Sequence, residues 1–381
     1  MNRVVSAVRA AVLAALATVE DPELRRPITE LNMVDSVAVS DTGRVQVRIL
    51  LTVAGCPLRD VLEQRIGDAL AQIAGVSELR VEIGVMSDEQ RDTLFTRLRG
   101  TSSDERATNN PFNAPDCATT VLAVASGKGG VGKSSVTVNL AVALSRLGFR
   151  VGLLDADIYG HSVPDMLAIG DQQPNVVSGV IMPVSAYGVT VMSIAMMKES
   201  RSQVIAWRGP MLDRALQQFL SDVYWGELDY LLVDLPPGTG DVAMSVAQLL
   251  PSSKVLVVTT PQVAAAEVAE RAGTMAFMLK QDVIGVVENM SWLETNCQHC
   301  GAAQRVNVFG SGGGSAVTRA LSERFGHDVP LLAQIPIDEG LRAGGDTGSP
   351  IVLADAPHPA AAALMTLAAH IATWRQALQN R

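Results

Sequence analysis

Short apolar runs alternate with helix-like patterns through the last two thirds of the chain. The runs are continuously apolar, which is typical of strands that are covered by helices on both faces of a sheet. The predicted strands are Val121–Ala125, Val151–Leu154, Tyr230–Val233, Val255–Thr259, Val283–Val287 and Leu331–Ile335. We therefore expect an α/β domain over residues 119–381, with a mostly parallel sheet and helices on both of its faces.

The first 98 residues follow a different pattern. Val4, Val8, Val12 and Leu16 recur at four-residue spacing, which predicts an amphipathic helix that ends before Asp21-Pro22. The other expected elements are a β-hairpin, a second helix and a third strand, at Val34–Val39 with Val45–Val53, from Pro57, and at Leu79–Val85. Residues 1–98 are thus predicted to form a small α+β domain.

A polar segment joins the two patterns. Residues 99–118 contain two prolines and show no apolar period, so they are predicted to be a linker. At the start of the chain, Arg3 and Arg9 precede an apolar stretch as long as that of a secretory signal. The helical spacing of its valines favours a helix of a folded domain instead.

Composition narrows the class of protein. The chain has 381 residues, of which 48% are apolar, and a formal charge of −9 without long runs of like charge. We therefore expect neither nucleic acid nor a membrane as partner. Four cysteines cannot build a disulfide scaffold at this length, which favours a reducing compartment, by default the cytoplasm.

A glycine-rich loop follows the first strand of the α/β domain and precedes a helical pattern. Its spacing fits G-x-x-x-x-G-K-[ST], in which backbone N–H groups surround a phosphate at a helix N-terminus. Lys133 would reach the β- and γ-phosphates, and the Ser134 hydroxyl would coordinate Mg²⁺. The predicted loop residues are Gly127, Lys128, Gly129, Gly130, Val131, Gly132, Lys133, Ser134 and Ser135.

Carboxylates end two of the predicted strands. Asp155 and Asp157 follow the strand that begins at Val151, and Asp234 follows the strand that begins at Tyr230. The carboxyl ends of parallel strands border the crevice in which α/β sheets bind ligands. The alternative is that these are ordinary aspartates that cap strand ends.

The segment Lys128–Ser134 resembles the deviant Walker A loop of the MinD/ParA/nitrogenase-iron-protein class of ATPases. The resemblance implies a nucleotide-dependent homodimer in which Lys128 reaches the partner's phosphates and stabilises charge in the transition state. It also implies that Asp157 orients the attacking water and that Asp234 holds Mg²⁺ through its water shell. Asn289 resembles the asparagine that binds the adenine edge in this class.

Cys297 and Cys300 are separated by two residues, so one turn can bring both sulfurs to one side. A thioredoxin-like redox pair would need a different setting, and a zinc site within one chain would need two more ligands. Two cysteines from each of two chains give four thiolates, the number that binds a [4Fe–4S] cluster. Zinc would accept the same four sulfurs.

The motifs together resemble the Mrp/ApbC family of iron–sulfur cluster carrier ATPases over residues 119–355. The motifs are Lys128–Ser134, Asp155–Gly160, Trp207–Met211, Asp234–Asp241, Glu288–Ser291 and Cys297/Cys300. The resemblance implies a homodimer that binds ATP, hydrolyses it slowly, and passes a [4Fe–4S] cluster to apo iron–sulfur proteins with the help of assembly factors.

Two local features qualify this resemblance. Gln298 stands where family members commonly have proline, and His161 replaces another common proline. The segments Asp21–Leu24 and Ala54–Leu58 resemble the small iron–sulfur-assembly-related domain that precedes the ATPase in bacterial members. Cys56 in the second segment is a candidate auxiliary ligand or a small buried apolar residue.

Two other functions compete with the carrier. A ParA/MinD-like positioning ATPase would bind a membrane or DNA through a basic C-terminal helix, but residues 360–381 carry only Arg375 and Arg381 as cations. That segment is predicted to be a packing helix. A zinc-binding ATPase scaffold would use the same cysteines without carrying a cluster.

Overall fold

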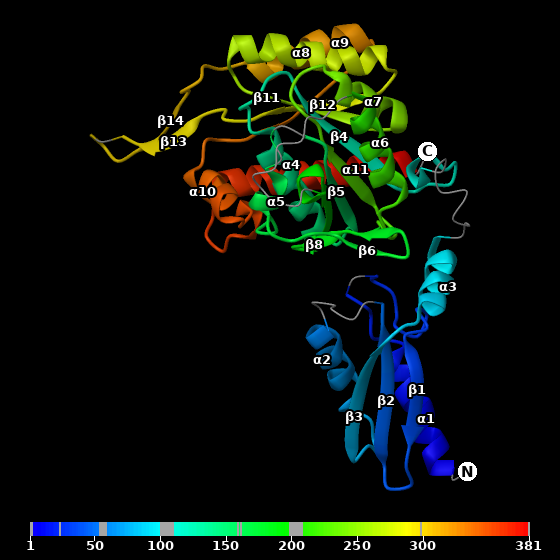
Figure 1. The fold of residues 1–381 in the computed structure, drawn as a ribbon. Helices are drawn as coiled ribbons and strands as arrows, with labels where there is room; N and C mark the ends of the chain where they lie inside the picture. Colours follow the sequence, from blue (N-terminus) through cyan, green and yellow to red (C-terminus); the bar gives the residue numbers. More distant parts are fainter. Residues whose placement is uncertain are drawn as a thin grey trace. The chain divides into compact units, whose positions relative to one another are not determined.

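The computed structural model describes residues 3–22, 24–52, 59–99, 110–157, 160, 162–197, 209–297 and 299–379 (Figure 1). The contacts divide the chain into two compact units. One comprises Met1–Arg106 with Asn175–Met182, and the other comprises Ala107–Pro174 with Pro183–Arg381.

The first unit contains a three-stranded sheet in the order β1-β2-β3, in which β1 and β2 are antiparallel and β2 and β3 are parallel. Its main elements are α1 (Arg3–Leu16), β1 (Val34–Val39), β2 (Arg44–Leu51), α2 (Arg59–Leu70), β3 (Glu78–Val85) and α3 (Asp88–Arg99). Val12 and Leu16 of α1 are fully buried, as are Ile66 and Leu70 of α2. The four-residue spacing at the start of the chain therefore marks the buried face of a helix.

The second unit is built on an eight-stranded sheet in the order β15-β12-β11-β4-β10-β5-β9-β8. Its strands are β4 (Thr120–Ser126), β5 (Val151–Asp155), β8 (Val184–Ala186), β9 (Val189–Ser193), β10 (Tyr230–Asp234), β11 (Lys254–Thr259), β12 (Val283–Glu288) and β15 (Leu331–Gln334). All neighbours are parallel except the β8–β9 pair. The predicted α/β class is confirmed, and β8 and β9 are the strands of this sheet that the sequence analysis missed.

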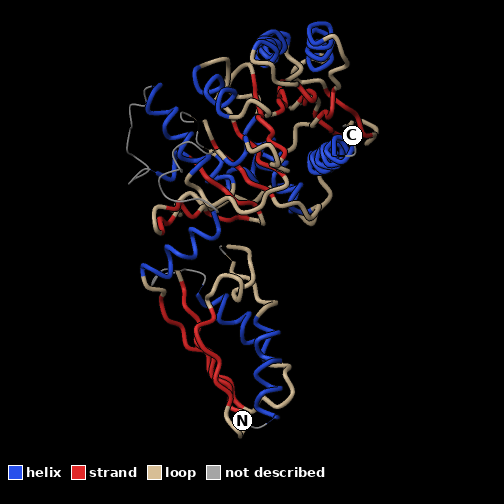
Figure 2. Tube along the Cα trace, turned by 90° about the vertical axis from the view of Figure 1, so that its right-hand side faces the viewer, coloured by secondary structure: helices blue, strands red, loops and turns tan. Residues whose placement is uncertain are grey.

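Helices cover both faces of this sheet (Figure 2). The helices of this unit are α4 (Lys133–Arg146), α5 (Val163–Met166), α6 (Gly209–Ser221), α7 (Asp241–Leu249), α8 (Val263–Met278), α9 (Gly313–Phe325), α10 (Glu339–Thr347) and α11 (Pro359–Gln379). Leu122 and Val124 of β4 share a core with Leu140 of α4 and Leu367 of α11. Since side chains alternate along a strand, Ala123 and Ala125 point to the opposite face, where α8 contacts β4. Both faces of β4 are thus buried, as its continuous apolar run predicted.

Part of the predicted linker packs on the second unit. The side-chain amides of Asn110 and Asn113 donate to the carbonyl of Leu249 at 2.7 and 2.8 Å. Phe112 is buried and meets Trp225 edge to face. Arg375 of α11 donates to the carbonyl of Ala118, at the end of the linker, and to the carboxylate of Asp229, each at 3.2 Å. Among the described residues, no helix is both long enough and apolar enough to cross a bilayer.

Candidate functional site

The glycine-rich loop forms a cradle at the carboxyl edge of the sheet, where β4 passes through this loop into α4. Gly130 and Gly132 both have φ of +80°, a left-handed conformation that side chains rarely adopt. The loop encloses a cavity of about 200 Å³. Its lining residues are Ser126, Lys128, Gly129, Gly130, Val131, Gly132, Lys133, Ser134, Ser135, Asp157, Ser162, Met166 and Pro237.

The loop is held closely at two points. A Cβ atom on Gly127 would lie 2.2 Å from the carbonyl carbon of Val268 and 2.3 Å from the nitrogen of Ala269, both in the backbone of α8. A Cβ atom on Gly132 would lie 2.2 Å from Nδ2 of Asn289. These glycines therefore permit close approach of the loop to α8 and to the end of β12.

Beneath the loop, Lys133 is held by carboxylates. Its Nζ lies 2.7 Å from Oδ2 of Asp234 and 3.8 Å from Oδ2 of Asp157. Lys133 is only 5% exposed and Asp234 is fully buried. The ammonium of Lys133 thus balances the buried charge of Asp234. The loop motif predicts that this same ammonium reaches the phosphates of a nucleotide.

Asp234 also accepts hydrogen bonds from two hydroxyl groups of α4. Ser134 Oγ donates to Oδ2 at 2.6 Å, and Thr137 Oγ1 donates to Oδ1 at 2.7 Å. Thr137 lies three residues after Ser134, on the same face of the helix, which is the signal that the sequence analysis missed. The carboxylate and hydroxyl oxygens are the hard donors that Mg²⁺ prefers, so these residues fit the ion.

Asp155 lies deeper than Asp157. Its carboxylate accepts hydrogen bonds from Ser193 Oγ at 2.8 Å and from the backbone N–H of Asp157 at 3.1 Å. Burial, together with the charge of Asp234, raises the pKa of Asp155 to about 7. Asp157 instead lines the cavity and accepts the N–H of Gly160 at 3.0 Å. Of the two, Asp157 is therefore the carboxylate that can face a ligand.

Lys128 lies at the rim of the cradle. Its Nζ donates to Oε1 of Gln262, at the start of α8, at a distance of 2.9 Å. Gln262 was not among the predicted site residues.

Asn289 lies under the loop. Its Nδ2 donates to the carbonyl of Val131 at 2.9 Å, and the side chain is only 2% exposed. Its Oδ1 is buried and has no hydrogen-bond partner within the described parts of the chain. Asn289 is absent from the cavity lining, so the predicted contact with adenine stays a prediction.

The two cysteines sit at the tip of a hairpin formed by β13 (Leu293–Asn296) and β14 (Ala303–Val306), which extends away from the rest of its unit (Figure 1). Cys297 N–H donates to the carbonyl of Ala302, and Gly301 N–H donates to the carbonyl of Cys297, each at 2.8 Å. Gly301 has φ of +72°, so glycine suits this turn. Cys300 is exposed and Cys297 is half-buried.

Backbone groups of the turn favour the thiolate of Cys297. Hydrogen bonds from the N–H groups of His299 and Cys300, and from the Cys300 side chain, lower the pKa of Cys297. A thiolate is the form that binds metal. Among the residues described, no cluster of three or more histidine, cysteine or acidic side chains is placed to hold a metal ion.

The base of the hairpin is braced by an aromatic residue. The guanidinium of Arg305 lies 4.2 Å from the ring centroid of Trp292, and its Nε lies 3.5 Å from Oε1 of Glu294. The sequence analysis missed both strands, because all of their residues are at least partly exposed and show no apolar alternation.

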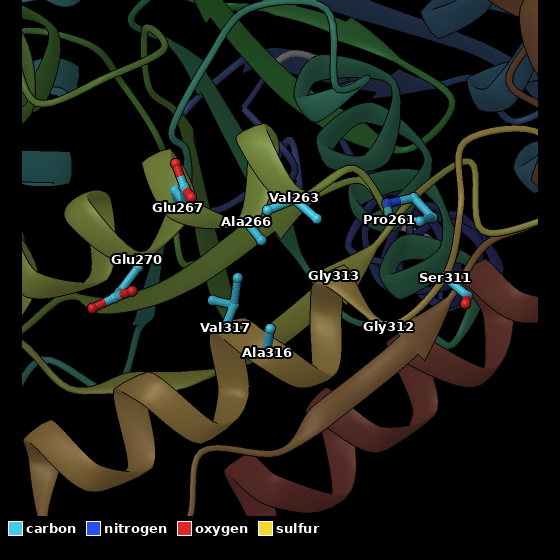
Figure 3. Close-up of a pocket in the computed structure, with 10 residues that line it drawn as sticks. All are labelled: Pro261, Val263, Ala266, Glu267, Glu270, Ser311, Gly312, Gly313, Ala316 and Val317. Atoms are coloured by element: carbon cyan, nitrogen blue, oxygen red, sulfur yellow. The ribbon is translucent and has the colours of Figure 1, made fainter.

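A second cavity of about 160 Å³ lies between the N-terminal parts of α8 and α9 (Figure 3). Pro261, Val263 and Ala266 form one side, and Ala316 and Val317 form the other. Glu267 and Glu270 also line it, and their negative charge disfavours a phosphate ligand. This second cavity is therefore not a candidate phosphate site.

Several predicted features lie outside the described residues. They are Cys56, His161, Gln298, the segment Ala54–Leu58, and Trp207 with Arg208. Cys117, which was not predicted to be a ligand, is half-buried.

The sheet order, the loop and the buried Lys133–Asp234 pair define a P-loop NTPase. Residues 118–372 match the family described as NUBPL iron-transfer P-loop NTPase, and residues 9–83 match a family of iron–sulfur cluster assembly proteins. The chain belongs to the iron-transfer P-loop NTPase family, with an assembly-type domain in front, so the resemblance found in the sequence is confirmed.

Similar proteins agree with this assignment. The iron–sulfur cluster carrier protein of Mycobacterium tuberculosis is 53% identical over 369 residues, which cover 97% of this chain and 94% of that protein. That of Bacillus subtilis is 41% identical, over 84% of this chain and 85% of its own length. A solved nucleotide-binding protein of Archaeoglobus fulgidus, in complex with ADP, is 38% identical with a TM-score of 0.50, over 61% of this chain and 87% of that one.

Proposed function

We propose that this protein is an ATP-dependent carrier that holds a [4Fe–4S] cluster between the subunits of a homodimer and transfers it to apo iron–sulfur proteins. The observation that carries the proposal is the hairpin turn at Cys297 and Cys300. It presents two cysteines, one with a lowered pKa, on the same chain as a phosphate cradle. The relatives named iron–sulfur cluster carrier proteins support the same function.

ATP with Mg²⁺ is the proposed nucleotide. The loop from Gly127 to Ser135 would surround its phosphates, and the hydroxyl of Ser134 with the carboxylate of Asp234 would hold the ion. Mg²⁺ supplies charge neutralisation at the phosphates when it is bound. The Archaeoglobus fulgidus protein, which was solved in complex with ADP, supports a nucleotide as the ligand. The buried acceptor of Asn289 supports its predicted hydrogen bond to adenine.

The residues around the cradle suit slow hydrolysis. Asp157 lines the cavity beside Lys133, where its carboxylate can orient an attacking water. Lys128 lies at the rim, where its ammonium can reach the phosphates of a second subunit. A cation there would stabilise the charge that spreads over the transferring phosphoryl group.

The cluster is the cargo of the proposed reaction. One chain offers two thiols in this turn, so two chains together offer the four thiolates that a [4Fe–4S] cluster needs. The recipients are apo iron–sulfur proteins, and assembly factors supply the cluster. The cysteines must stay reduced to hold it, a requirement that the cytoplasm meets.

Anaerobic reconstitution with iron and sulfide tests the proposal. The wild-type protein is compared with the double variant Cys297→Ala/Cys300→Ala, and with Cys117→Ala as a control that removes a thiol elsewhere. We expect about four iron atoms per dimer in the wild type and in the control, and almost none in the double variant. Iron counting, visible absorbance and mass in solution are measured.

The same experiment distinguishes the other functions. An equal iron content in the wild type and the double variant would show that these cysteines do not bind the cluster. Tight zinc with no iron would favour a zinc scaffold. A monomeric product without iron that binds liposomes or DNA only with ATP would favour a positioning ATPase.

A further inference from the structure

We propose that Gln262 is a positioning residue for Lys128. It holds the ammonium at the rim of the phosphate cradle through a neutral contact that phosphate oxygens of a second subunit can replace. This inference rests on the proposed function, because it assumes that Lys128 acts across the dimer.

The contact itself is short and specific. Nζ of Lys128 donates to Oε1 of Gln262 at 2.9 Å, and both residues are half-buried. Over the described part of the chain, no carboxylate lies within ion-pairing distance of Lys128. Lys133, five residues later, is held instead by Asp234 at 2.7 Å and approached by Asp157.

The position of Gln262 is fixed by the packing of α8. Gly127, next to Lys128, meets the backbone of Val268 and Ala269 so closely that only glycine fits there. Gln262 immediately precedes α8 in an extended conformation, with φ of −62° and ψ of 133°. Its neighbours Pro261 and Val263 line the second cavity (Figure 3), whereas Gln262 contacts Lys128. The amide thus reaches the loop from the residue that directly precedes α8.

The chemistry of the contact explains why an amide suits this position. The hydrogen bond from the ammonium to the neutral amide lacks the attraction between opposite charges that an anionic phosphate oxygen would add, so such an acceptor can displace it. A carboxylate at the same place would form an ion pair, and that pair would have to break before Lys128 crossed to the partner. Gln262 therefore keeps Lys128 ordered without trapping it.

The test compares Gln262→Glu with Gln262→Met, which keeps the shape of the side chain but removes the acceptor. Gln248→Glu adds the same charge on an exposed position of α7 and serves as the matched control. We expect Gln262→Glu to lower the steady-state ATPase rate about three- to tenfold, with the KM for ATP unchanged. The loss should shrink as ionic strength rises, because salt screens a partly exposed pair.

Gln262→Met should lower the rate by less than about threefold, without dependence on salt. A wild-type rate in Gln262→Glu, or a loss in Gln262→Met as large as in Gln262→Glu, would overturn the inference. If the Glu variant fails to fold, a loss of more than about threefold in Gln262→Met, or a loss that depends on salt, would overturn the inference.

ATP-induced dimerisation in a Lys128→Ala background gives an independent readout. Gln262→Glu should weaken dimerisation when Lys128 is present and should have no further effect when it is absent. An equal effect in both backgrounds would show that Gln262 acts without Lys128. If Lys128→Ala alone keeps the wild-type ATPase rate, it is the proposed function of Lys128 that fails.

Discussion

At the scale of residues, the cradle is organised by three carboxylates with unequal surroundings. Asp234 is paired with Lys133 and receives two hydroxyl groups, and Asp157 faces the cavity. Asp155 is buried and forms no ion pair with any residue that the structure describes, and its hydrogen bonds come from Ser193 and from the backbone of Asp157. Burial therefore raises the pKa of Asp155 to about 7.

This shift makes stability depend on pH. In the unfolded chain Asp155 titrates near 3.8, and in the folded chain near 7, so the folded state binds more protons between these values. The contribution of Asp155 to stability is therefore full below pH 4 and is lost as the pH rises to about 7. We expect Asp155→Asn, which carries no charge, to gain about 2 kcal/mol of unfolding free energy relative to wild type between pH 5 and pH 8.

Urea unfolding of both proteins at the two pH values measures this gain. Asp355→Asn is the control, because Asp355 is exposed. A difference between Asp155→Asn and wild type that is the same at pH 5 and at pH 8 would contradict the prediction.

At the scale of elements, the phosphate loop is shaped by what packs against it. Its glycines are needed for different reasons. Gly130 and Gly132 adopt left-handed conformations, whereas Gly127 is needed because α8 passes close to it. The motif predicted the glycines, but the partner of Gly127 lies about 140 residues further along the chain and could not be read from spacing.

Substitution of Gly127 by alanine tests this close approach. The added Cβ would lie 2.2 Å from a backbone atom of α8, so the helix or the loop must move. We expect a loss of about 1–3 kcal/mol in unfolding free energy, and a weaker affinity for ATP. Chemical unfolding and nucleotide titration measure the two effects.

Gly129→Ala is the matched control for stability, because its Cβ would meet nothing closer than Pro237 Cγ at 3.9 Å. An unfolding free energy of Gly127→Ala equal to that of the control would mean that α8 can yield, and would refute the tight packing.

The strands also show which elements the pattern of apolar residues can predict and which it cannot. The predicted central strands are apolar because both of their faces are covered, so their places in the sequence were clear. The hairpin that carries the cysteines was missed, since β14 is exposed throughout and has no apolar face. This hairpin is instead held together by backbone pairing between β13 and β14 and by the contact of the Arg305 guanidinium with the Trp292 ring.

At the scale of the second unit, the proposed nucleotide site and the cysteine hairpin are connected by a short stretch of chain. Asn289 contacts the phosphate loop at Val131, and β13 begins only four residues later, at Leu293. Between them, Ser291 N–H donates to the carbonyl of Ile335 at 2.9 Å, and Ile337 N–H donates to that of Trp292 at 2.7 Å. We propose that this short, hydrogen-bonded segment transmits a change in the position of the loop to the hairpin.

Such a connection predicts reciprocal binding. If ATP changes the affinity for the cluster, the cluster must change the affinity for ATP by the same factor, which we expect to be about fivefold or more. Asn289→Ala should bring both factors close to one, while Asn307→Ala, at an exposed position after β14, should leave them unchanged. Equilibrium titration with ATP and competition for iron with a chelator give the two affinities.

Two equal factors that persist in Asn289→Ala would show that the coupling takes another route. Unequal factors in the wild-type protein would show that the titrations are not at equilibrium, because linkage requires them to agree.

The sequence alone predicted those features of this protein that depend on residues close together in the chain. The apolar runs predicted the six strands, and the loop motif with the strand-end aspartates predicted which residues surround the glycine-rich cavity, because each depends on residues close together in the chain. Contacts between distant segments needed the tertiary structure: Gln262 beside Lys128, Ser193 beside Asp155, and Asn289 under Val131. Burial and hydrogen bonding across the sheet create these pairs, and no spacing along the chain encodes them.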